Sequence, residues 1–125
     1  MERKTLEQNI ERYLAVRNIE HVMNDEIIEE PRKLLSEYQF TLRGLSKMMT
    51  IRLYEYIKTG KVGFEQSHYM HTPVQAGPYI TDVTGGDDET NVIQRAVTTL
   101  TRFYNDAVRE GHKPDDSWLK INENF

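Results

Sequence analysis

One glutamate and two histidines stand at three-residue intervals near the middle of the chain. Glu65, His68 and His71 are residue types that bind zinc and other divalent metals. On a helix they would share one face, whereas on a strand His68 and His71 would point to opposite faces. Gly63 and Pro73 flank the segment and disfavour a helix. Metal binding or metal-dependent hydrolysis therefore stays an alternative, and we expect no metal and no cofactor.

A second group of chemistry-bearing side chains is basic. Residues 41–63 hold five lysines and arginines against one glutamate, although the whole chain has a formal net charge of −4. Lysines neutralise phosphates and tyrosines stack on bases, so a helix there could bind nucleic acid. An ordinary solvated helix face carries similar charges and is the favoured interpretation. The residues of this candidate binding face are Arg43, Lys47, Tyr54, Lys58 and Lys61.

Arg52 is expected on the apolar side of the same helix. A guanidinium there must find a carboxylate, reach the surface or contact a partner, because burying an unpaired charge is costly. We expect an internal ion pair rather than a functional arginine. The acidic cluster that could supply the carboxylate contains Asp25, Glu26, Glu29 and Glu30.

Catalytic motifs are not evident in the sequence. The chain has no cysteine, which excludes thiolate catalysis and cysteine-ligated zinc. No serine stands in a Gly-x-Ser-x-Gly motif, and the acids after Gly85 and Gly86 would repel a phosphate. We therefore predict no catalytic residues, and whether the protein is an enzyme stays open, with a non-enzyme favoured.

Four helices are expected to position these side chains. The capping pair Thr5 and Gln8 predicts a helix over 6–23, apolar nearly all round in its second half and so buried against more than one neighbour. Pro31 predicts the start of a second helix, although residues 36–43 also alternate as a strand would. A third helix is predicted over 45–59, with Gly60 after its end. The fourth, over 90–110, has its apolar residues within an arc of about 160°.

Residues 61–89 are rich in glycine and proline and show no helical period. Two short strands, Val62 to Met70 and Tyr79 to Val83, could form a small β-hairpin there. The predicted fold is thus mainly α, with three to four amphipathic helices around one core and the hairpin within 62–83 as an α+β variant. We expect a single domain over 1–125, with residues 112–125 as a docked or flexible tail that holds Trp118.

These patterns favour a small intracellular protein that binds other proteins, as a regulator or assembly factor, with a homodimer as one option. Its partner would be another protein or a second copy of the chain, whereas nucleic acid is disfavoured. No apolar run approaches the roughly 18 residues that a membrane span needs, so we expect no membrane association and a cytoplasmic location.

Overall fold

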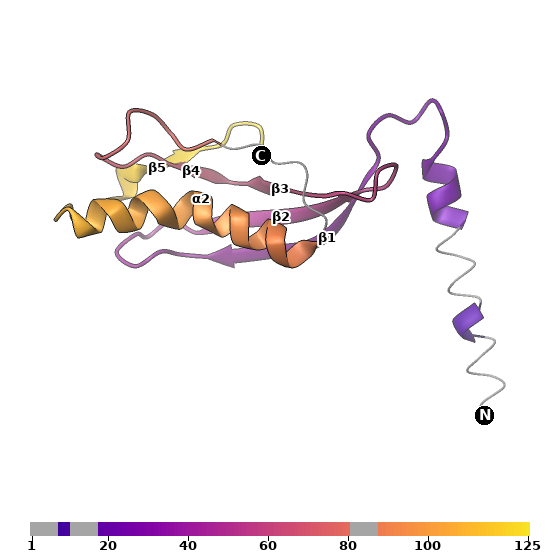
Figure 1. Ribbon diagram of the computed structural model, residues 1–125, viewed down its shortest axis with the longest axis horizontal. Helices are drawn as coiled ribbons and strands as arrows, with labels where there is room; N and C mark the ends of the chain where they lie inside the picture. The colour runs from indigo at the N-terminus through magenta and orange to yellow at the C-terminus, as the bar shows by residue number, and fades with distance from the viewer. Residues whose placement is uncertain (1–7, 11–17, 81–87) are drawn as a thin grey trace.

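The computed structural model describes residues 8–10, 18–80 and 88–125. Residues 8–10 and 18–23 are helical and lie in the N-terminal segment that projects from the body of the molecule (Figure 1). In the body, residues 32–80 and 88–125 form five strands, one long helix and a short 3-10 helix. In chain order these are β1 (Arg32–Phe40), β2 (Met49–Tyr56), β3 (Val62–Gln66), β4 (His68–Met70), α2 (Glu89–Arg109), η1 (Asp116–Trp118) and β5 (Leu119–Ile121).

The strands form two antiparallel sheets. One has the order β1-β2-β3 and the other pairs β4 with β5. Ser67 separates β3 from β4 and joins the two sheets. It binds Thr50 of β2 through its main chain and hydroxyl, and its carbonyl oxygen accepts from Asn122 N–H at 2.8 Å.

Strand β2 supplies the centre of the core. Met49, Ile51 and Leu53 have no exposed surface, whereas the residues between them are partly exposed. This period of two is the pattern of a strand with one buried face. The predicted helix over 45–59 is therefore wrong, and Gly60 lies instead in the turn between β2 and β3, with φ at 71°. A left-handed φ of this kind favours glycine.

Strand β1 contradicts the helix predicted from Pro31. The register of β1 against β2 shifts between Leu34 and Ser36, so the strand contains a β-bulge. A bulge inserts one residue and reverses the inside–outside phase, so Leu34, Leu35 and Tyr38 acquire helix-like spacing in a strand. Pro31 precedes the first strand residue, where a missing N–H is tolerated. The strand alternative for residues 36–43 is realised as far as Phe40.

The β-hairpin predicted within 62–83 is also wrong. The segment from Val62 to Met70 does form β3 and β4, but β3 pairs with β2 and β4 pairs with β5. Tyr79 lies outside any strand, and its N–H donates to Met70 O at 2.9 Å. Residues 81–83 fall outside the described ranges.

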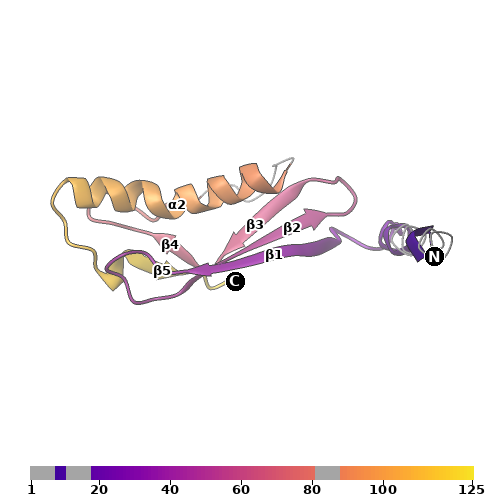
Figure 2. The same cartoon turned by 90° about the horizontal axis from the view of Figure 1, so that it is seen from below.

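Helix α2 confirms the helix predicted over 90–110. Asp88 caps it by accepting from Asn91 N–H at 2.8 Å. The buried side of α2 includes Val92, Ala96 and Leu100, and it packs chiefly against β2, β3 and β4 (Figures 1 and 2). One main helix against two small sheets is an α+β arrangement, so the predicted mainly α class is wrong.

The C-terminal residues lie against the same core. Trp118 is 5% exposed and meets the Tyr104 ring edge-on, with ring centroids 6.0 Å apart. His71 N–H donates to Trp118 O at 2.8 Å. Asp116 accepts from the N–H and hydroxyl of Ser46, which holds the pKa of this carboxyl below its usual value and ties the β1–β2 loop to η1.

The N-terminal helical residues differ from expectation. Ile19 and Val22 are each 59% exposed, so the burial expected for this part of the helix is wrong. Residues 6–7 and 11–17 of the predicted helix lie outside the described ranges. None of the helices in the described ranges has the length and apolar character that crossing a membrane requires.

Shortening Leu100 to alanine should lower the free energy of unfolding by about 2–5 kcal/mol, because this side chain has no exposed surface and its loss leaves a cavity. Urea denaturation of the purified protein measures the change. Val108→Ala is the matched control on the same helix, since Val108 is 42% exposed. Equal losses in the two variants would contradict the packing described here.

Candidate interaction surface

The five residues of the predicted basic face do not form one surface. Arg43 and Lys47 lie in the loop between β1 and β2, whereas Lys58 and Lys61 lie in the turn at the opposite end of β2. An eight-residue strand separates these ends by roughly 26 Å. Tyr54 lies within β2, and the Arg32 guanidinium lies 4.0 Å from the centroid of its ring. The helix that would have aligned them is absent from this part of the chain.

The three metal candidates also have separate partners. Glu65 forms an ion pair with Arg32, His68 Nδ1 lies 2.8 Å from Ser67 Oγ, and His71 Nε2 lies 3.3 Å from Gln75 O. Among the described residues, no group of three or more histidine, aspartate or glutamate side chains could hold a metal ion. The structure therefore does not bring these three residues together as ligands.

Arg52 has a different partner from the one predicted. Its Nε lies 3.6 Å from Glu37 Oε1, the residue directly opposite on β1, and its guanidinium lies 4.2 Å from the centroid of the Phe125 ring. The acidic cluster predicted to pair with Arg52 therefore does not supply its carboxylate partner. The pair is partly exposed and belongs to the outer face of the sheet, the face turned away from α2.

Arg32 makes a similar arrangement on the outer face. It pairs with Glu65 on β3 and lies 4.0 Å from the centroid of the Tyr54 ring on β2. The hydrogen bond to Glu65 is the main reason that the pKa of Arg32 is raised. Each arginine on this face thus has both a carboxylate and an aromatic ring, which leaves little uncompensated charge for a ligand there.

The open feature of the sheet is the unpaired side of β1. Within the described ranges, β1 pairs only with β2. Thr50 N–H donates to Ser67 Oγ at 2.8 Å and Thr50 O accepts from Ser67 N–H at 2.9 Å, so the main chain of Thr50 points away from β1. Residues paired in an antiparallel ladder point both toward or both away from each other. Gln39, opposite Thr50, and Glu37, opposite Arg52, therefore point their N–H and C=O groups to the open side.

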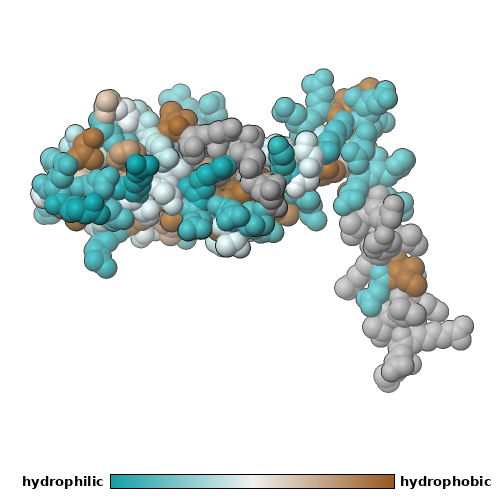
Figure 3. Space-filling model, in the orientation of Figure 1, coloured by the Kyte–Doolittle hydropathy of each residue, from teal (hydrophilic) through white to brown (hydrophobic). Residues whose placement is uncertain are grey.

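Apolar side chains accompany these free main-chain groups. Leu34 is 50% exposed on the outer face and Tyr38 is 46% exposed on the inner face, beside the half-buried Phe40. We call these three side chains and the unpaired side of β1 the β1 edge. In Figure 2, β1 lies on the side of β2 and β3 that is away from α2. The rest of the surface in the view of Figure 3 is mostly hydrophilic, with small hydrophobic patches.

The nearest flank of α2 is also incompletely covered. Tyr104 Oη donates to Arg43 O in the β1–β2 loop at 2.5 Å, so this flank of the helix faces the β1 side. Ile93 and Val97 share the flank by helical periodicity and are only partly buried. Ile93, Val97 and Tyr104 therefore form a partly buried apolar strip on the flank of α2 that faces the β1–β2 loop.

Sequence reasoning did not find the β1 edge. Tyr38 and Phe40 fall in residues 36–43, for which helix and strand are both open, whereas Leu34 falls in the helix predicted from Pro31. No charge or motif marks these three residues. The alternation of Tyr38 and Phe40 with polar residues was the available signal, because alternation is typical of a strand with one buried face.

The fold and the β1 edge define an α+β protein whose three-stranded sheet is covered by one helix and is open at an edge strand. No family model, no curated protein and no solved structure matches the chain.

Lowering the pH should destabilise the protein through His68. Burial is the first reason that the pKa of His68 lies below its usual 6.5, and repulsion by Lys47 is the second. The unfolded chain then binds the proton more tightly, so this contribution to stability is present above about pH 6.5 and is lost as the pH falls through the lowered pKa. Urea unfolding at a series of pH values measures the loss, and His68→Gln should reduce it.

Lys47→Gln gives a second readout of the same effect. Removing this positive charge should raise the pKa of His68, measured by NMR titration of the imidazole C–H resonances. Lys33→Gln on β1 is the control and should leave that titration unchanged. A His68 pKa at or above 6.5 in the unaltered protein would contradict this account.

Proposed function

We propose that this protein is a small protein-interaction or assembly protein that associates with a second copy of itself through the β1 edge. The observation that carries the proposal is an edge strand of nine residues with free main-chain groups and half-exposed apolar side chains. An unpaired strand of this kind is a template for adding another strand. Antiparallel pairing would make a continuous six-stranded sheet with both helices on one side.

The charges of β1 support a second copy as the partner. Arg32 and Lys33 stand at the start of the strand, and Glu37 stands in its second half. A two-fold axis through the edge reverses the partner strand, so Arg32 of one strand lies near Glu37 of the other, twice per dimer, on the same outer face. Each of these charges also keeps its ion pair within its own chain. An isologous two-fold dimer is also the commonest soluble oligomer.

The β-bulge between Leu34 and Ser36 restricts which strands can pair with the β1 edge. Bulges and charged side chains protect edge strands from indiscriminate pairing, because they break the flat row of donors and acceptors. A partner must then match both the local twist and the charge pattern.

Nucleic-acid binding and metal binding have less support. The basic residues lie at opposite ends of β2, and the metal candidates each have another partner. Neither alternative has a single surface on which its residues converge.

Light scattering should give a mass near twice the 14.7 kDa of one chain at micromolar or higher concentration. Gln39→Pro should convert the dimer to a monomer, because proline removes an N–H that points to the open side. Tyr38→Pro is the matched control one residue away, where the N–H faces β2. We expect the control to lower the urea midpoint far more than Gln39→Pro does.

A charge exchange tests the two-fold geometry. Glu37→Arg and Arg32→Glu should each weaken the dimer, and the double variant should restore it, because opposite charges on the outer face then meet again across the two-fold axis. A monomeric wild-type protein at all concentrations would contradict the proposal. So would a dimer that Gln39→Pro leaves intact.

A further inference from the structure

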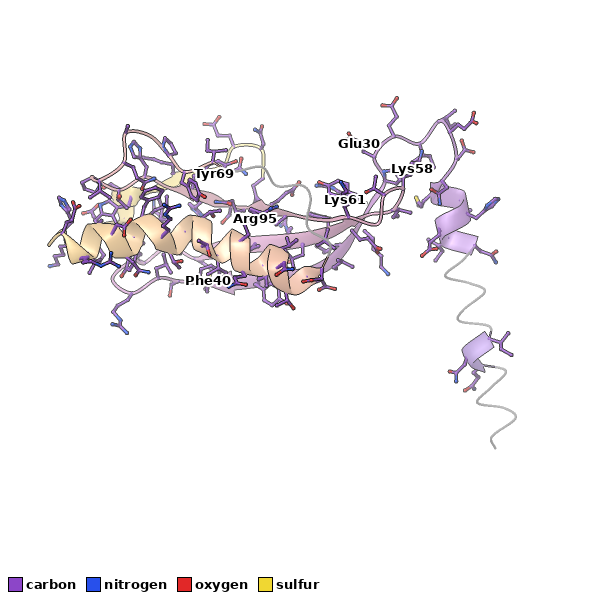
Figure 4. The ribbon with its side chains drawn as sticks, in the orientation of Figure 1. Glu30, Phe40, Lys58, Lys61, Tyr69 and Arg95 are labelled. Atoms are coloured by element: carbon purple, nitrogen blue, oxygen red, sulfur yellow. The ribbon has the colours of Figure 1, made fainter. Side chains whose placement is uncertain are left out.

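A pocket of about 350 Å³ lies at the end of the sheet where the β2–β3 turn meets the loop before β1. Its size falls within the usual range of small-molecule sites. The pocket is distinct from the β1 edge, and Figure 4 shows three of its residues, Glu30, Lys58 and Lys61, gathered at that end of the molecule. Its lining residues are Glu30, Pro31, Tyr56, Lys58, Thr59 and Lys61.

Hydrogen bonds hold the walls of this pocket in place. Lys58 Nζ donates to Asp25 O at 2.9 Å and to Ile28 O, which fixes the segment before β1 across the turn. Ile57 N–H donates to Pro31 O at 2.9 Å, and Tyr56 N–H donates to the Lys61 carbonyl at 2.8 Å. A pocket formed in this way needs little rearrangement to receive a ligand.

One wall contains a strained residue. Glu30 has φ at 48°, the left-handed region that non-glycine residues seldom adopt. Such a conformation is unfavourable for a residue with a Cβ atom and persists only where the surroundings enforce it. Glu30 lines the pocket immediately before Pro31 and the start of β1.

The pocket carries a net positive charge. Neither Lys58 nor Lys61 forms an ion pair within the described ranges, since Lys58 donates to neutral carbonyls and the Lys61 side chain has no hydrogen-bond partner there. Glu30 is the one carboxylate of the lining, so two ammonium groups stand against one negative charge. The partly exposed Tyr56 ring supplies apolar surface beside them, and the buried Pro31 closes that side of the pocket.

We propose that this pocket binds a small organic anion. Its anionic group, a phosphate or a carboxylate, contacts the Lys61 ammonium and the positive field of Lys58. Its apolar or aromatic body packs on Pro31 and the Tyr56 ring. Lysine recognises such groups as a point charge, so either anionic head group is accepted and the apolar body adds the remaining affinity.

Phenyl phosphate and benzoate are suitable probes, with inorganic phosphate as the probe that lacks an apolar body. Titration of the full chain, followed by NMR of its main-chain amides, should show saturable shifts concentrated at residues 56–61. The dissociation constant of phenyl phosphate should be on the order of 1 mM, the range expected for a fragment-sized ligand. Inorganic phosphate should bind more weakly.

Two variants should move the affinity in opposite directions. Lys61→Gln should weaken binding of phenyl phosphate by roughly five- to tenfold, and Glu30→Gln should tighten it, because each changes the charge of the pocket by one unit. Lys120→Gln on β5 is the control and should change nothing. Both substitutions are at exposed positions, so folding is preserved and is checked by the amide spectrum.

Three results would overturn the proposal. The first is the absence of saturable shifts with either organic probe. The second is an affinity that Lys61→Gln does not lower. The third is an equal affinity for inorganic phosphate and phenyl phosphate, which would show that apolar contacts with Pro31 and Tyr56 contribute nothing to binding. None of these results bears on self-association through the β1 edge, which is measured separately.

Discussion

The width of a single helix determines how many strands of the sheet can be buried in this structure. An α-helix with its side chains is about 10 Å across, and strands lie about 4.8 Å apart, so one helix covers roughly two strands of a sheet. Helix α2 packs on β2 and β3 and continues over β4, which leaves β1 at the rim. Because α2 covers β2, the inward side chains of β2 are completely buried. Because α2 does not reach β1, side chains of β1 stay half exposed.

The outer face of the sheet and the β1 edge, which α2 does not cover, differ in how their polar groups are satisfied. On the outer face, Arg32 and Arg52 bind carboxylates and lie over aromatic rings, so that face satisfies its own charges. At the β1 edge the main-chain groups of Glu37 and Gln39 have no partner of this kind within the described ranges. Another strand can hydrogen-bond to these main-chain groups and also cover the apolar side chains, whereas water satisfies only the main-chain groups. Self-association through this edge is consistent with both properties.

Sequence patterns predicted α2 because its apolar residues keep one period over the whole helix and Asp88 caps it. They failed at β2 because Leu45 and Met48 in the loop before it and Tyr56 at its end fit a helical arc, although the buried residues of the strand alternate. They failed at β1 because the bulge shifts the phase of alternation. The pairing of β4 with β5 joins residues about fifty positions apart, which no local pattern encodes. The candidate surfaces depend on these strands, so neither the β1 edge nor the pocket could be located from sequence.

Amide hydrogen exchange at single-residue resolution tests the central claim most directly. The N–H groups of Glu37 and Gln39 point away from β2, so in a monomer they face solvent. If the β1 edge pairs with a second copy, their exchange slows as protein concentration rises, while that of the buried strand β2 is already slow. Rapid exchange of both amides at every concentration, beside a protected β2, would contradict the account.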